Sequence, residues 1–107
     1  VRATDELRAS DAEAAAMLTL AARLYHHASR LGQSYRTFRD ASVRAFQAGS
    51  SARAAHLLLD AATVAMDRGR RAEAQEAADL AGYVLRVSRL TPQERTAVLS
   101  RVEYPAG

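Results

Sequence analysis

One stretch of the chain combines a thin polar edge with broad apolar surface. Between Ala52 and Arg68 the polar residues stand three or four positions apart. Because an α-helix has 3.6 residues per turn, this spacing places them along one narrow edge and leaves the rest of the helix apolar. We therefore expect a central helix over residues 51–68 that is surrounded by other helices. Its polar edge consists of Arg53, His56, Asp60, Thr63 and Asp67.

Helical periodicity accounts for the remainder of the chain, and no stretch shows the two-residue alternation of a β-strand. Because the connections are short, consecutive helices should be antiparallel neighbours. We expect one all-α domain over residues 1–107, with two stacked hairpins and a C-terminal capping helix. Residues 1–9 either extend the first helix or fray, and residues 103–107 fray. The expected helices cover residues 11–31, 34–48, 51–68, 71–89 and 92–102.

Several residues predict where these helices begin and end. Ser10 is the expected N-cap of the first helix and Gly32 its C-cap. Gly82 lies inside the fourth helix, where it costs about 1 kcal/mol relative to alanine, and this favours a close helix crossing there. Thr91 and Glu94 have the spacing of a capping box, which predicts the start of the last helix.

Apolar stripes predict the inward face of each helix. Since 25 of the 107 residues are alanine, helix axes can approach closely, and the core should be tight and thin. The first helix should bury Met17, Ala21, Leu24, Ala28 and Leu31; the second should bury Tyr35, Phe38, Ala41 and Ala45 together with Val43 and Phe46; the last should bury Ala97, Val98 and Val102.

Composition restricts the function only mildly. The net charge is +3, from fifteen Arg against twelve acidic residues, and Lys, Ile and Asn are absent. Their codons are rich in A and T, so a GC-rich bacterial genome explains the scattered arginines better than nucleic-acid binding does. The absence of cysteine excludes disulfides. No apolar run could span a bilayer and no signal peptide is visible, so we expect a cytoplasmic protein, although a start at Val1 leaves a removed segment open.

The segment from Leu58 to Leu85 resembles a tetratricopeptide repeat, a hairpin of about 34 residues that stacks into a superhelix. With Gly69 at the turn, small residues fall where that motif has them. A shift of 37 residues places Gly32 on Gly69 and Phe46 on Tyr83. The motif's tryptophan and closing proline are missing, and a generic alanine-rich hairpin explains the same residues. The resemblance implies a module that binds a peptide or helix in a groove.

A second segment, from Leu90 to Leu99, is similar to the opening of a LuxR-type helix-turn-helix domain. This resemblance implies an accessory helical domain of a transcriptional regulator, with weak electrostatic affinity for nucleic acid. The chain holds no recognition helix after this segment, so we expect no direct reading of DNA. The capping box alone also explains these residues.

Five residues are candidates for a partner-binding surface. Arg53, His56 and Asp60 form the polar edge of the central helix, which a wet groove between the hairpins would expose. The plainer interpretation of His56 and Asp60 is a surface hydrogen-bonded pair, since a metal would need two further ligands. Tyr35 and Phe38 flank the first turn between helices. Packing in the core is the default for both, and an exposed anchor for a partner is the alternative.

No catalytic, cofactor-binding or metal site is expected, because the chain has no nucleophile elbow, phosphate-binding loop or zinc motif. We therefore expect a non-catalytic interaction or scaffold module with a protein or peptide partner. One alternative is a homodimeric helical protein whose thin core a second copy completes. The other is the regulator domain described above. Neither a membrane nor a nucleic-acid partner is expected.

Overall fold

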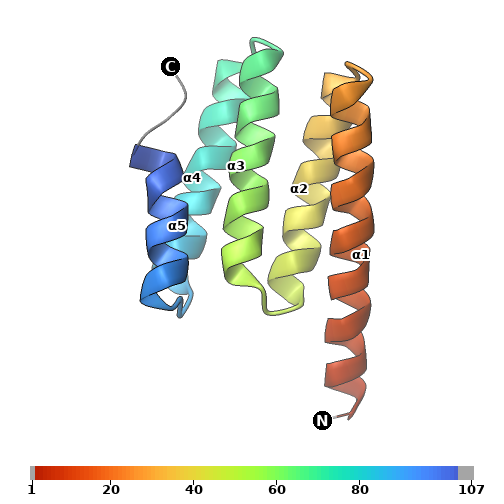
Figure 1. The fold of residues 1–107 in the computed structure, drawn as a ribbon, viewed down its shortest axis with the longest axis vertical. Helices are drawn as coiled ribbons and strands as arrows, with labels where there is room; N and C mark the ends of the chain where they lie inside the picture. The colour runs from red at the N-terminus through yellow and green to blue at the C-terminus, as the bar shows by residue number, and fades with distance from the viewer. Residues whose placement is uncertain (1, 104–107) are drawn as a thin grey trace.

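The computed structural model describes the backbone of residues 2–103 and the side chains of residues 5–102, and this part of the chain is all-α. The expected fold class and stacked hairpins are confirmed (Figure 1). None of the described helices combines the length and apolarity needed to cross a membrane. Of residues 103–107, which were expected to fray, Glu103 ends the last helix and residues 104–107 lie outside the described residues. The helices are α1 (Arg2–His27), α2 (Leu31–Gln47), α3 (Ser51–Asp67), α4 (Arg71–Val87) and α5 (Pro92–Glu103).

The helices form a flat stack of two layers, with extents of 44 × 30 × 19 Å. Each of the first three helices packs against the next one, and α5 packs against α3. In Figure 1, α1, α3 and α5 lie nearer the viewer and form the front layer, whereas α2 and α4 form the back layer. Helix α3 therefore has neighbours on several sides, as the broad apolar surface beside its polar edge predicts.

Three turns of the same geometry join the first four helices. The middle residue of each turn has a positive φ: 61° at Ser29, 86° at Gly49 and 74° at Gly69. In each turn the next residue donates its amide hydrogen to a carbonyl five positions earlier, as Ser50 does to Ala45 at 2.9 Å. This bond is typical of a Schellman C-cap. Glycine adopts the left-handed region without strain, so the two glycine turns are unstrained. Ser29 takes a backbone conformation that is sterically unfavourable for a residue with a side chain.

The turns show that the structural repeat differs from the register expected from the sequence. Ser29, and not Gly32, corresponds to Gly69, so the hairpin repeats after 40 residues and the single helix after 20. The 37-residue shift is wrong because Gly32 lies inside α2. Buried alanines follow the 20-residue spacing, since Ala41, Ala61 and Ala81 are all fully buried.

Helix α1 is longer than the sequence signals indicated. It begins at Arg2 and continues through Ser10, so Ser10 is not an N-cap and residues 2–9 extend the helix. The sequence offers nothing that stops a helix in this region: residues 2–9 include neither Gly nor Pro. The N-terminal end of α1 projects beyond the other helices (Figure 1).

The core consists largely of alanine, as the composition predicts. Two buried clusters share α3: one packs it against α1, α2 and the start of α4, and the other packs it against α4 and α5. In the second cluster Val98 of α5 is fully buried between α3 and α4. Ser34 is also fully buried, and its hydroxyl donates a 2.8 Å hydrogen bond to the carbonyl oxygen of Ala22, which joins α1 to α2.

Several inward faces differ from the expected ones. Met17 and Leu24 are each 69% exposed, because α1 turns Ala15 and Ala22 toward α2 instead. These small side chains allow a close approach that the larger ones would prevent. The prediction for Tyr35, Phe38, Ala41 and Ala45 in α2 is confirmed, as is that for Val98 in α5. The exposed residues that were expected to face inward also include Val43, Phe46, Ala97 and Val102.

The start of α5 matches its sequence signal. The amide of Thr91 donates to Oε1 of Glu94 at 2.9 Å, and the amide of Glu94 donates to Oγ1 of Thr91 at 3.1 Å. The predicted capping box is therefore confirmed. The close crossing expected at Gly82 is wrong: a Cβ built there would meet only the side chain of Arg86, at 3.7 Å.

Candidate functional site

The polar edge of α3 lies at a hollow in the front layer. Arg53, His56 and Asp60 line this hollow together with Leu57, which is 4% exposed and forms its apolar floor. Arg53 is exposed, and His56 and Asp60 are half-buried. The structure thus brings the three polar candidates of the central helix together at one concave surface, which we call the front groove.

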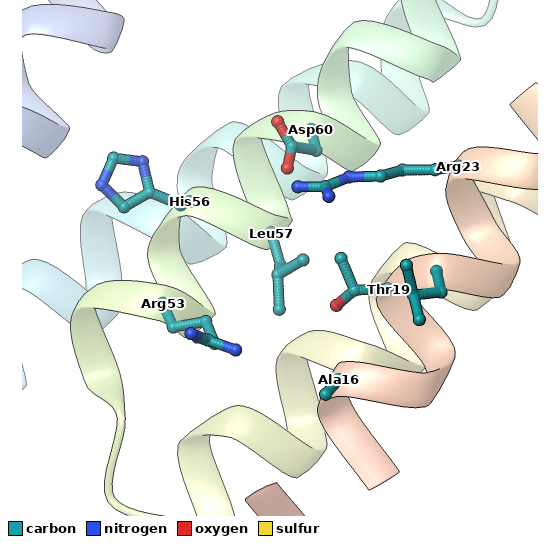
Figure 2. A pocket seen from close by; sticks show the side chains of 8 residues that line it. Ala16, Thr19, Arg23, Arg53, His56, Leu57 and Asp60 are labelled. Atoms are coloured by element: carbon teal, nitrogen blue, oxygen red, sulfur yellow. The ribbon is translucent and has the colours of Figure 1, made fainter. Parts of the chain in front are cut away.

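Helix α1 supplies the opposite wall of the front groove. Ala16, Thr19, Leu20 and Arg23 line this wall, and the space between the walls measures about 620 Å³. Ala16, Thr19 and Arg23 are seen on α1 in Figure 2. Leu20 is 57% exposed, so the wall offers an apolar side chain as well as a guanidinium group. Figure 2 shows Arg23 extending from α1 toward α3. Helices α1 and α3, which form the two walls of the groove, point in the same direction.

Arg101 of α5 holds the polar edge of α3 from the other side. Its Nη2 donates to Oδ1 of Asp60 at 2.7 Å, and its Nη1 lies 3.1 Å from both Nδ1 and the carbonyl oxygen of His56. The side chains of Arg101 and Asp60 are 35% and 33% exposed. The ion pair with Asp60 and the contacts with His56 fix two lining residues of the front groove and tie α5 to α3.

The contact with Arg101 also sets the protonation of His56. Arginine has only donors, so Nδ1 of His56 must accept, and the ring proton of the neutral form lies on Nε2. Burial, and then the positive charge of Arg101, lower the pKa of His56 from its ordinary value of 6.5, while Asp60 opposes this shift. His56 is therefore neutral at neutral pH, and the surplus charge of the groove comes from arginine.

Tyr35 and Phe38 do not belong to an exposed surface. They are 6% and 4% exposed, so the default interpretation of core packing is confirmed for both, and the alternative of an exposed anchor is wrong. A large ring among the alanines of the core cluster fills space that these small neighbours leave open, which explains the burial of both rings.

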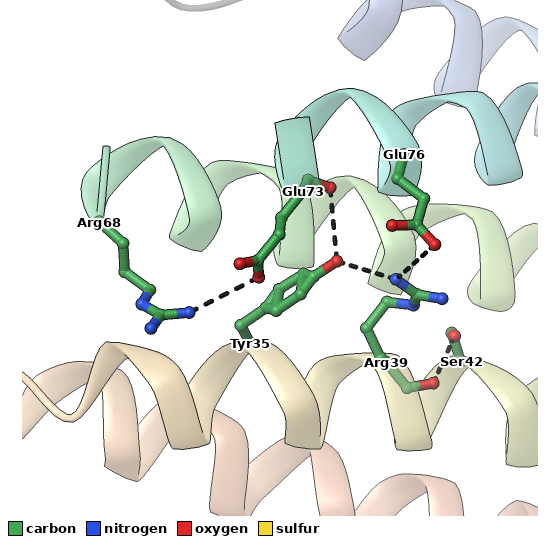
Figure 3. A network of polar contacts seen from close by, with 6 residues as sticks. All are labelled: Tyr35, Arg39, Ser42, Arg68, Glu73 and Glu76. Carbon is green, nitrogen blue, oxygen red and sulfur yellow. Dashed lines mark hydrogen bonds and ion pairs between the residues drawn. The ribbon is translucent and has the colours of Figure 1, made fainter. Parts of the chain in front are cut away.

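The hydroxyl of Tyr35 forms part of a polar network between α2 and α4. It accepts a 2.8 Å hydrogen bond from Nη1 of Arg39 and donates at 3.3 Å to the carbonyl oxygen of Glu73 (Figure 3). Arg39 also lies 3.9 Å from Glu76, and Arg68 lies 3.6 Å from Glu73. This network joins the two hairpins in the back layer and has a structural role.

The back layer has a hollow of different chemistry. It measures about 300 Å³ and lies between α2 and α4, with Leu58 of α3 among its lining residues. Its wall residues Val43, Phe46 and Tyr83 are 54%, 46% and 55% exposed. We call this surface the back groove. Its apolar lining could not be predicted from the sequence, which placed Val43 and Phe46 in the core.

Neither groove has the parts of a metal site. Among the described side chains, no group of three His, Asp or Glu residues could hold an ion. The expected surface hydrogen-bonded pair of His56 and Asp60 is wrong: both side chains are half-buried, and each contacts Arg101 and not the other. Arg101 lies 41 residues from Asp60 in the chain, and no sequence pattern pairs such distant positions.

Comparison with known proteins gives this chain no relative. No protein-family model, no curated protein and no solved structure matches it. Its function must therefore be inferred from the surfaces of the stack, and of these the front groove holds most of the residues that the sequence singled out.

Proposed function

We propose that the protein is a non-catalytic interaction module that binds a peptide or a helix of a partner protein in the front groove. The observation that carries this proposal is the hollow between α1 and α3, where Arg53, His56 and Asp60 line one wall. Its volume of about 620 Å³ is within the usual range of binding sites. An open channel between two helices suits an elongated ligand better than a compact one.

The arrangement of the helices supports a module of the tetratricopeptide-like type. Stacked hairpins place α1, α3 and α5 in one layer, and the groove lies in that layer. The repeat of 40 residues exceeds the approximately 34 residues of a tetratricopeptide repeat. The likeness to that family therefore concerns the architecture of the stack.

The chemistry of the lining residues also favours binding over catalysis. The hydroxyl of Thr19 donates to the carbonyl oxygen of Ala15 at 2.7 Å, and Nδ1 of His56 accepts from Arg101. The hydroxyl of Thr19 is thus engaged with its own helix, and the ring nitrogen Nδ1 of His56 is engaged with α5. A nucleophile would instead be expected within hydrogen-bond reach of a base.

Selection from a phage-displayed library of short peptides tests this function. Synthetic versions of the selected peptides would be titrated by fluorescence anisotropy against the protein, the groove variant Leu20→Ser and the control variant Val102→Ser. Leu20 and Val102 are both exposed, but only Leu20 lines the groove. We expect peptides whose affinity falls only in the groove variant. A library that yields no such peptide would contradict the proposal.

A second candidate function is self-association through the back groove. The exposed apolar residues Val43, Phe46 and Tyr83 lie together there, and contiguous apolar patches mark interaction surfaces. Light-scattering mass across a wide range of concentration tests it. A dimer that dissociates in the variant Phe46→Glu would support this candidate, and a monomer at every concentration would exclude it.

A further inference from the structure

We propose that the partner segment in the front groove is acidic and carries an apolar side chain, with its carboxylates held by Arg23 and Arg53 and its apolar group against Leu20. This inference rests on the proposed function, because it names the chemistry of the ligand for the same groove.

The arginines of the front groove differ from those that the fold uses. Arg39, Arg44, Arg68 and Arg101 each pair with a carboxylate. Within the described side chains, Arg23 and Arg53 form no ion pair and no hydrogen bond, although both are exposed and line a hollow. Other exposed arginines are also unpaired, but these two are part of a concave surface. Their charge is therefore available to a ligand.

The acidic residue of the lining does not cancel this charge. Asp60 is the one carboxylate among the lining residues, and Arg101 already holds it at 2.7 Å. Together Arg23, Arg53, Arg101 and Asp60 leave a surplus of positive charge, since neutral His56 adds none. Charge complementarity thus favours an anionic ligand and disfavours a basic one.

The two free guanidinium groups lie at different levels along the groove. Arg53 and Asp60 are seven residues apart on α3, which is a rise of about 10 Å. Figure 2 shows Arg23 extending toward the level of Asp60, whereas Arg53 lies below Leu57. An extended segment advances about 3.3 Å per residue, so acidic residues three positions apart fit this spacing.

The lining also favours a protein segment over a nucleic acid. Single-stranded nucleic acids bind where bases can stack on aromatic rings in a basic channel. The lining residues include no Phe, Tyr or Trp, and the ring of His56 is half-buried and engaged by Arg101. Leu20, by contrast, is 57% exposed and suits an aliphatic side chain.

The peptide library described above also tests this inference. Among peptides whose binding depends on the groove, we expect enrichment of Asp and Glu, often three positions apart, near a Leu, Ile or Val. Affinity should fall as salt is raised, because the contacts are ionic and partly exposed.

Charge-reversed variants test the named residues. The double variant Arg23→Glu, Arg53→Glu should bind a selected acidic peptide at least about tenfold more weakly. The control Arg36→Glu, Arg86→Glu changes the net charge equally at exposed positions outside the groove, and it should stay within about twofold of the wild type. A peptide with Lys in place of its acidic residues should regain affinity for the groove double variant. Circular dichroism of all variants verifies that they remain folded.

Four results would overturn the inference. Selected peptides that are neutral or basic, yet depend on Leu20, would refute the acidic partner and leave the proposed function standing. Equal losses in the groove and control double variants would show that only the overall charge matters. Tighter groove-dependent binding of oligothymidylate than of any peptide would assign the groove to nucleic acid. If no groove-dependent peptide is found, the proposed function fails as well.

Discussion

The front and back grooves are built on the same helix but differ in chemistry. Leu57 of α3 forms the floor of the front groove, and the next residue, Leu58, lines the back groove. Arg23 and Arg53 line the front groove beside Leu57, whereas Phe46 and other apolar side chains line the back groove. The turns and the core follow the 20-residue repeat. The chemistry of the exposed surface instead depends on whether a helix lies in the front or the back layer.

The largest effect on stability is expected at the buried leucine that each groove contains. The variants Leu57→Ala and Leu58→Ala each remove a side chain that is 4% or 5% exposed. We expect each to lower the free energy of unfolding by about 2–5 kcal/mol, because truncation of a buried leucine leaves a cavity. Urea denaturation measures both. If only one variant lost less than about 1 kcal/mol, the leucine of that groove would not be tightly packed.

A smaller effect should distinguish the front layer. The variant Arg101→Leu leaves Asp60 and the carbonyl group of His56 without their donor, and we expect a loss of about 1 kcal/mol in the free energy of unfolding. The matched control is Arg95→Leu, which changes an exposed arginine of the same helix. Equal urea midpoints for the two variants would show that the contacts of Arg101 contribute nothing.

The pH dependence of stability tests the same contacts. The pKa of His56 is lowered in the folded protein, so the unfolded chain binds the proton more tightly. The stabilisation is present above the unfolded pKa of 6.5 and is lost as the pH falls from there toward the folded pKa. We therefore expect the wild type to lose more stability than His56→Asn between pH 7.5 and pH 5.5, since asparagine keeps an acceptor but does not titrate. Thermal unfolding at both pH values measures this, and identical losses would contradict it.

The smallest effect is expected at the back groove. The double variant Phe46→Ser, Tyr83→Ser changes side chains that are 46% and 55% exposed. We expect the free energy of unfolding to change by no more than about 1 kcal/mol, and the affinity for a groove-selected peptide to stay the same. A tenfold loss of peptide affinity would place the binding surface in the back layer and not in the front.

Much of the fold could be predicted because helix periodicity and glycine are local signals. The central helix, expected over residues 51–68, spans Ser51–Asp67, and the turns at Gly49 and Gly69 lie where glycine indicates. Ser29 could not be recognised as the first turn, because serine seldom takes a positive φ and Gly32 stands three residues later. The 20-residue spacing of Ala41, Ala61 and Ala81 was a usable signal for the true register.

The site could be predicted only in part. The polar edge of α3 was visible because its neighbours are apolar, so Arg53, His56 and Asp60 stood out. Nothing in the chain shows that α1 forms the second wall or that Arg101 reaches α3, since these contacts depend on packing between distant segments. In α1 the stripe of larger apolar residues predicted the wrong buried face, because alanine decides which face of such a helix is buried.

The central claim is that the front groove receives the partner, and amide chemical-shift mapping tests it most directly. The labelled protein would be titrated with an acidic peptide from the selection and followed by nuclear magnetic resonance. We predict that the largest shifts fall on α1 and α3 around Leu20, Arg23, Arg53 and Leu57. Shifts centred instead on Phe46 and Tyr83, with the front groove unaffected, would contradict the account.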